Sequence, residues 1–157
     1  MAPMATILCP TRGGTASVPA QEWAIDLARR MGADLVFLYV SNTHFLDRFS
    51  YPRSVDISAE LDELGEFLLA MAQDRAENAG IPAQTVVRQG EFREQLADVI
   101  REHNVSIVVI GLSRQSTGVL TETYRTYLSR SLLEELGVEV YVIGDGQVME
   151  HYAPNDA

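Results

Sequence analysis

The sequence predicts an α/β domain, an open five-stranded parallel sheet with helices on both faces. Short apolar runs alternate with longer segments whose apolar residues recur at helical spacing. Two of the runs, Leu35 to Val40 and Ser106 to Leu112, are apolar almost throughout rather than alternating, which is typical of parallel strands covered on both sides. Strands and helices that alternate in this way form right-handed βαβ units.

The first half of the chain shows clear boundary signals. Ser17 can cap a helix whose second residue is Pro19, and Gly32 ends that helix. Gly80 and Pro82 end the next one. The expected elements are a strand at Ala5–Pro10, a loop at Thr11–Ser17, a helix to Met31, a strand at Leu35–Val40, a long connection at Ser41–Ile57 and a helix at Ser58–Ala79.

The second half repeats the same unit. The expected elements are a strand at Thr85–Arg88, a helix carrying Leu96, Val99 and Ile100, a strand at Ser106–Leu112, a helix carrying Tyr124, Leu128, Leu132 and Leu136, and a last strand at Val138–Ile143. No change in composition marks a second domain. We therefore expect one domain over residues 1–144 and a polar tail over residues 145–157.

Charge and composition exclude several classes of function. The 157 residues carry a net charge of -10, which repels a polyphosphate backbone, so we expect no nucleic-acid partner. All 12 basic residues are arginines, which excludes Schiff-base and P-loop lysine chemistry. No apolar run approaches the roughly 20 residues that span a bilayer, so we expect no membrane partner. With the single Cys9 and no signal-peptide pattern at the N-terminus, we expect a cytoplasmic location.

Three loops are candidates for a ligand site, namely Pro10–Ser17, Ser41–Ile57 and Ser113–Leu120, and the first and last of them are unlike the rest of the protein. Ligands of open parallel sheets bind beyond the carboxyl ends of the strands, where the strand order reverses. The loop at Thr11–Ser17 offers glycines, hydroxyls and Arg12, and the segment from Ser113 to Arg130 is rich in hydroxyls and arginines. A cationic window in an acidic protein is typical of a phosphate site. The alternative is that these residues are ordinary loop and cap residues.

The chain resembles the universal stress protein family. The resemblance covers Ala5 to Ile143 and is carried by the order and spacing of four segments and a turn: Ala5–Thr11, Ala28–Leu35, the Gly90 turn, Ser106–Gly111 and Glu139–Ile143. It implies a sheet of strand order 3-2-1-4-5, of the adenine nucleotide alpha hydrolase-like or Rossmann-like type. It also implies a dimer formed through the last strand and, in one branch, an ATP site between the first and fourth strands.

The ATP-binding motif of that branch is degenerate here. ATP-binding members usually have an Asp after the first strand, where this chain has Arg12. Gly111 matches the first glycine of the motif, but Arg114 stands at the second, and Tyr124–Ser129 has no match to the final Gly-Ser. Glycines let backbone N–H groups approach phosphates closely, so larger side chains crowd that approach.

Two interpretations follow from the crowding. Arg12 and Arg114 can bind phosphate oxygens in place of the lost backbone donors, which makes the protein a regulatory module for ATP, another adenine nucleotide or another anion. Alternatively the cleft is empty, and the protein acts through dimerisation and protein partners. For the first interpretation, the predicted binding residues are Pro10, Thr11, Arg12, Gly13, Val40, Gly111, Ser113, Arg114, Thr126 and Ser129.

We predict no catalytic residues, although a weak ATPase activity is compatible with this interpretation. His44 and His103 have no second ligand at metal-binding spacing, so we expect no metal site. The last strand, Val138 to Ile143, is apolar and β-branched. If it lies at a sheet edge, its unpaired backbone groups need to be covered by another strand. A second copy of the chain can supply that strand, which predicts a homodimer through Val138–Ile143.

Overall fold

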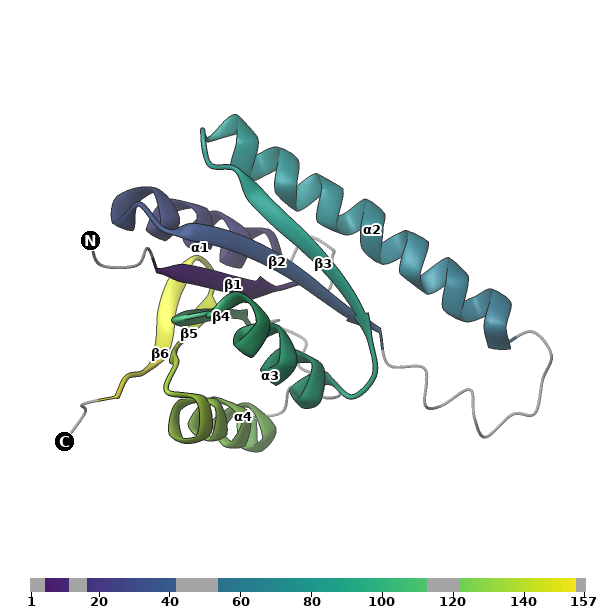
Figure 1. Ribbon diagram of the computed structural model, residues 1–157. Coiled ribbons are helices and arrows are strands. Elements are labelled where there is room, and N and C mark those ends of the chain that lie inside the picture. The colour runs from purple at the N-terminus through teal and green to yellow at the C-terminus, as the bar shows by residue number, and fades with distance from the viewer. Residues whose placement is uncertain (1–4, 12–16, 42–53, 113–121, 155–157) are drawn as a thin grey trace.

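The described residues form a single six-stranded sheet with two helices on each face. The computed structural model describes residues 5–11, 17–41, 54–112 and 122–154 (Figure 1). The elements are β1 (Thr6–Pro10), α1 (Val18–Met31), β2 (Asp34–Ser41), α2 (Ser54–Asn78), β3 (Ala83–Gln89), α3 (Phe92–His103), β4 (Ile107–Gly111), α4 (Glu122–Leu136), β5 (Glu139–Gly144) and β6 (Gln147–Tyr152).

The strand order is β3-β2-β1-β4-β5-β6, which confirms the predicted 3-2-1-4-5 order. The first five strands are parallel, and β6 is antiparallel to β5. The five-stranded prediction missed β6, because residues 145–157 were expected to be a tail. Residues 147–152 of that segment instead extend the sheet, after a two-residue turn at Asp145 and Gly146.

Alternate residues of the parallel strands pack into two separate cores. On one face Ile7, Phe37 and Val109 pack with α1 and α2. On the other face Leu8, Val36 and Val108 pack with α3 and α4. Figure 1 shows these two layers on either side of the sheet. Since both faces are covered, the central strands are apolar throughout, as the sequence indicated.

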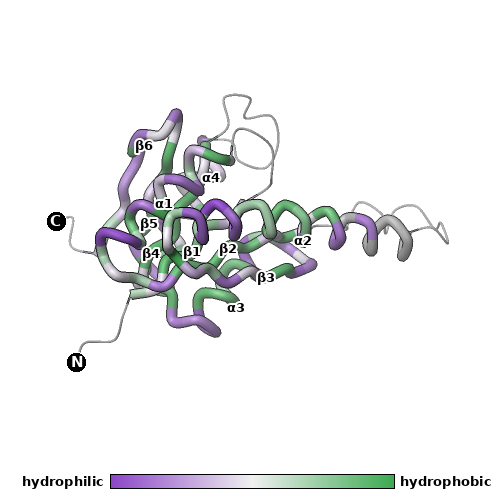
Figure 2. The backbone as a smooth tube through the Cα atoms, turned by 90° about the horizontal axis from the view of Figure 1, so that it is seen from above, coloured by the Kyte–Doolittle hydropathy of each residue, from purple (hydrophilic) through white to green (hydrophobic). Residues whose placement is uncertain are grey.

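Helix α2 begins earlier than expected, at Ser54 rather than Ser58, and runs for 25 residues. A helix of this length spans roughly 37 Å, far more than a strand of seven residues. Figure 2 shows α2 extending beyond the other described elements. The expected connection at Ser41–Ile57 is correspondingly shorter, and its residues 42–53 lie outside the described parts of the chain.

Candidate functional site

The carboxyl ends of β1, β2 and β4 meet at one edge of the sheet, because β1 is paired with β2 on one side and with β4 on the other. Pro10 ends β1, Val40 lies next to the end of β2, and Gly111 ends β4. The Thr11 N–H continues the ladder by donating to Leu38 O over 2.8 Å. Four of the ten predicted site residues, Pro10, Thr11, Val40 and Gly111, therefore lie at this edge.

Helix α1 reaches the same edge and packs closely on β4. A Cβ built on Gly111 would lie 3.0 Å from the Ala20 Cβ, which is tighter than ordinary contact. The first turn of α1 contains Pro19, which has no N–H, and the Ser17 side chain makes no capping bond to the helix. The positive end of the α1 dipole thus lies beside Gly111, an arrangement that favours an anion.

The Thr11 hydroxyl is oriented by a relay of two hydrogen bonds. Arg75 Nη1 donates to Gln21 Oε1 over 2.9 Å, and Gln21 Nε2 donates to Thr11 Oγ1 over 2.7 Å. Because a guanidinium can only donate, Arg75 fixes which end of the Gln21 amide faces Thr11. Gln21 and Thr11 are both buried. The Thr11 hydroxyl therefore accepts from Gln21 and directs its own hydrogen elsewhere.

A carboxylate at the ends of β2 and β3 was missed by the sequence analysis. Asp62 of α2 accepts from Ser41 Oγ at 3.3 Å and from Gln89 Nε2 at 2.5 Å. Its partners end two neighbouring strands and face each other in the register, Ser41 opposite Gln89, which is the signal that could have identified the cluster.

The predicted site residues on α4 point elsewhere. Ser129 is fully buried, and its Oγ has no partner among the described residues. Thr126 hydrogen-bonds the Tyr152 phenol. Arg125, which belonged to the predicted cationic window, forms an ion pair with Glu150 of β6 at 2.7 Å, where the two side chains are 10% and 25% exposed. The Arg125 guanidinium therefore binds the C-terminal strand β6.

The remaining predicted residues, Arg12, Gly13, Ser113 and Arg114, lie outside the described parts of the chain. Their convergence stays a prediction. Tyr127 belongs to the Tyr124–Ser129 segment that has no match to the final Gly-Ser of the motif, and it is 58% exposed on α4.

Cys9, the fourth residue of β1, is a buried thiol of the core. Burial raises the pKa of Cys9 to about 12, so the nucleophilic thiolate is scarce at neutral pH. Within the described residues no group of His, Cys, Asp and Glu side chains is arranged to hold a metal ion. No described helix is long and apolar enough to cross a membrane.

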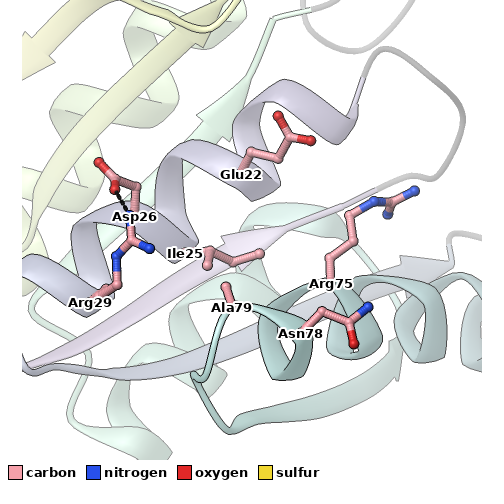
Figure 3. A pocket seen from close by; sticks show the side chains of 7 residues that line it. All are labelled: Glu22, Ile25, Asp26, Arg29, Arg75, Asn78 and Ala79. Carbon is pink, nitrogen blue, oxygen red and sulfur yellow. Dashed lines mark hydrogen bonds and ion pairs between the residues drawn. The ribbon is translucent and has the colours of Figure 1, made fainter.

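A shallow pocket of about 320 Å³ lies between α1 and α2 (Figure 3). It is lined by Ile25, Arg29, Arg75 and Ala79 among others, and Arg29 is paired with Asp26 there at 2.6 Å. Since α2 ends at Asn78 and β3 begins at Ala83, the pocket lies toward the amino ends of the strands. It is distinct from the predicted site, and Arg75 links the two by its hydrogen bond to Gln21, which in turn donates to Thr11.

The fold recurs in solved structures of universal stress proteins. The protein named UspA from Lactobacillus plantarum superposes with a TM-score of 0.71, 18% identity, and coverage of 91% of this chain and 99% of that one. A universal stress protein in complex with cAMP superposes with a TM-score of 0.63, 20% identity, and coverage of 88% and 96%. A universal stress protein family protein from Arabidopsis thaliana with AMP bound superposes with a TM-score of 0.62, 12% identity, and coverage of 89% of this chain and 91% of that one.

Sequence comparison agrees with the fold. The chain is 27% identical over 115 residues to the universal stress protein YxiE of Bacillus subtilis, covering 68% of this chain and 77% of that protein. The model of the universal stress protein family matches residues 4–135, which is most of the chain. The chain therefore belongs to the universal stress protein family.

Proposed function

We propose that this protein is a cytoplasmic regulatory module that binds an adenine nucleotide, or a related anion, at the carboxyl edge of β1, β2 and β4. The observation that carries the proposal is the meeting of Pro10, Thr11, Val40 and Gly111 at this edge, beside the N-terminus of α1. Relatives of the same fold have been solved with cAMP and with AMP, which supports an adenine nucleotide as the ligand class.

The charges at the edge favour one orientation of the ligand. The α1 N-terminus and Gly111 lie at the β1 and β4 side, where a phosphate is stabilised by the helix dipole. Asp62 lies at the β2 and β3 side, where a carboxylate repels phosphate but accepts hydrogen bonds from sugar hydroxyls. We expect the phosphates toward β4 and the nucleoside toward β2, with binding rather than turnover as the function.

Thermal unfolding with ATP, ADP, AMP, cAMP or inorganic pyrophosphate tests the proposal. A ligand at about 100 times its Kd stabilises by roughly 2.7 kcal/mol, which raises Tm by about 5 to 10 °C in a domain of this size. The shift should disappear in Arg114→Glu, a change at a predicted phosphate ligand. It should persist in Arg29→Glu, which makes the same charge change at the pocket between α1 and α2.

Two outcomes would contradict the proposal. Absence of a shift with every nucleotide would show that this edge holds none of them. A shift that survives Arg114→Glu as well as Arg29→Glu would place the site elsewhere on the molecule. A shift with pyrophosphate as large as with ATP would identify a general anion site, because the nucleoside would then add no binding energy.

The alternative function, binding of a protein partner, is favoured by the surface of α2. Leu64, Phe67 and Met71 lie at i, i+3 and i+7 and are 48%, 63% and 41% exposed. Seven acidic residues and one arginine lie on the same helix, so the fitting partner is a basic amphipathic segment rather than a second acidic chain. If no nucleotide raises Tm, partner binding through this surface of α2 becomes the favoured function.

A further inference from the structure

We propose that Arg75 and Gln21 are positioning residues for the candidate nucleotide edge. They fix the Thr11 hydroxyl as a hydrogen-bond donor beyond the end of β1, and so raise the affinity for ligands that present acceptor atoms there. The inference rests on the proposed function and adds a control of that site from α2, which carries none of the ten predicted binding residues. Arg75 follows Gln21 by 54 positions, and Gln21 follows Thr11 by 10.

Thr11 lies at the centre of the edge. It follows Pro10, the last residue of β1, and β1 is paired with β2 on one side and with β4 on the other. The Thr11 N–H donates to Leu38 O of β2 at 2.8 Å, which fixes the backbone at this point. A ligand with its nucleoside toward β2 and its phosphates toward β4 would cross the edge at Thr11. Adenine, ribose and phosphate all carry atoms that can accept from an O–H group.

Gln21 by itself does not determine which way the Thr11 hydroxyl donates. A glutamine amide has a donor end and an acceptor end, and a hydroxyl both donates and accepts, so either orientation of Gln21 gives a hydrogen bond to Thr11. If Oε1 faced Thr11, it would accept the hydroxyl hydrogen, which could then not be donated beyond the strand. The structure has the other orientation, with Gln21 Nε2 donating to Thr11 Oγ1 at 2.7 Å.

Arg75 removes this ambiguity. A guanidinium has only donors, and Arg75 Nη1 donates to Gln21 Oε1 at 2.9 Å. Turning the amide around would place its N–H groups against the guanidinium and leave donors of both side chains without acceptors. Gln21 and Thr11 are 2% and 4% exposed, so water does not readily replace a lost bond. The polarity is therefore passed from Arg75 through Gln21 to Thr11.

The contacts of Arg75 fit a positioning role. Within the described parts of the chain its half-buried guanidinium forms no ion pair and makes one hydrogen bond, to Gln21. By contrast, Arg93 and Arg125 are each paired with a glutamate. Figure 3 shows the Arg75 side chain rising from α2 toward the N-terminal half of α1, on the side away from Arg29. The structural effect of Arg75 is thus to orient Gln21.

Gln21→Glu tests the relay, because it reverses the polarity at Thr11 with almost no change in shape. A carboxylate has only acceptors, so it accepts from Arg75 at one oxygen and from the Thr11 hydroxyl at the other. Thr11→Val removes the same hydroxyl hydrogen directly. Titration calorimetry with ATP and with AMP should show that each variant raises Kd about fivefold or more, the loss expected for one hydrogen bond.

The double variant separates the relay from a general disturbance of the edge. Since both changes remove the same donor, Gln21→Glu should change Kd by less than about twofold in the Thr11→Val background. Asn78→Asp is the matched control for charge. It adds one negative charge at the pocket that Arg75 lines, without touching the relay, and should leave Kd within about twofold of the parent value. Circular dichroism checks that every variant is folded.

The role of Arg75 can be measured on the protein alone. The side-chain amide hydrogens of Gln21 are identified in NMR spectra by their absence in Gln21→Glu. In Arg75→Met they should exchange with water at least about tenfold faster than in the parent, because the amide is no longer held. Arg75→Lys keeps a positively charged donor and should stay closer to the parent.

The outcomes distinguish this inference from the proposed function. If the parent chain binds neither ATP nor AMP, the proposed function fails and the relay has no ligand to serve. If the parent binds and Gln21→Glu binds equally well, or its loss persists in the Thr11→Val background, only the relay is overturned. Should Gln21→Glu not fold, an unchanged Kd in Thr11→Val overturns it equally. An unchanged exchange rate in Arg75→Met would overturn the role of Arg75.

Discussion

Gly65 allows α2 to lie directly on the aromatic ring of Tyr39. A Cβ built at this position would be 2.3 to 2.9 Å from three ring carbons of that tyrosine. The ring belongs to β2, so the absent side chain sets the distance between helix and sheet. Sequence alone shows a glycine in the middle of a helix, where it costs about 1 kcal/mol relative to alanine.

Gly65→Ala should therefore destabilise the protein by about 1 to 3 kcal/mol, although alanine is the better helix former. The free energy of unfolding in urea measures it. In a Tyr39→Leu background the ring is absent, and the same substitution should cost less or even stabilise. Stabilisation of the parent chain by Gly65→Ala would show that the ring moves aside freely.

Glu91 determines where α3 begins. Its side chain accepts from the backbone N–H groups of Arg93 at 3.2 Å and Glu94 at 2.9 Å, and so satisfies two donors of the first turn. The sequence predicted a helix after Gly90 but identified no cap, because glutamate is uncommon at this position.

Glu91→Ala should lower the free energy of unfolding by about 1 kcal/mol, and Glu91→Ser should restore most of the loss because serine is a favoured cap. Urea denaturation of the three proteins provides the comparison. Equal stability of the alanine and parent chains would mean that water replaces the carboxylate at no cost.

The strand β6 was missed although its turn has a recognisable signal. Asp145 and Gly146 have φ of 52° and 78°, the left-handed values that a two-residue hairpin turn requires. The Asp-Gly pair is a strong hairpin signal, but the polar strand after it lacks the apolar alternation that identified the other strands. Glu150 and His151 hold the strand through Arg125 and Tyr141, which lie on other elements.

At the scale of the whole molecule, the topology could be predicted because every central strand is apolar on both faces and every helix has one apolar face. The candidate site could be predicted only where it depends on strand ends. Pro10, Val40 and Gly111 follow from the topology, whereas the Thr11 relay and the Asp62 cluster depend on side-chain partners up to 54 residues away. Local patterns carry no information about such pairs.

Alkaline pH should destabilise the molecule. Burial raises the pKa of Tyr141 and of Tyr152, with the bond to Glu150 adding to the shift of Tyr152, and burial raises the pKa of Cys9 to about 12. In each case the folded state holds the proton more tightly than the unfolded state. The raised pKa values therefore contribute fully to the free energy of unfolding below about pH 9. This contribution is lost as the pH rises toward the pKa values of the folded state.

Urea unfolding between pH 7 and pH 11 measures this loss. The free energy of unfolding should be constant up to about pH 9 and then decrease. In Cys9→Ala the decrease should be smaller by up to about 1.4 kcal/mol per pH unit, since one titrating group has been removed. A free energy that stays constant to pH 11 would contradict the raised pKa values.

The antiparallel direction of β6 has a practical consequence for attachment. Without it, the chain would leave the sheet at Gly144, on the edge where β1 and β4 end. Because β6 returns past β5, Tyr152 lies opposite Val140, on the same side of the sheet as the first residue of β1 (Figure 1). A sensor chip or fluorescent label joined at either terminus should leave the opposite rim open to small molecules in solution.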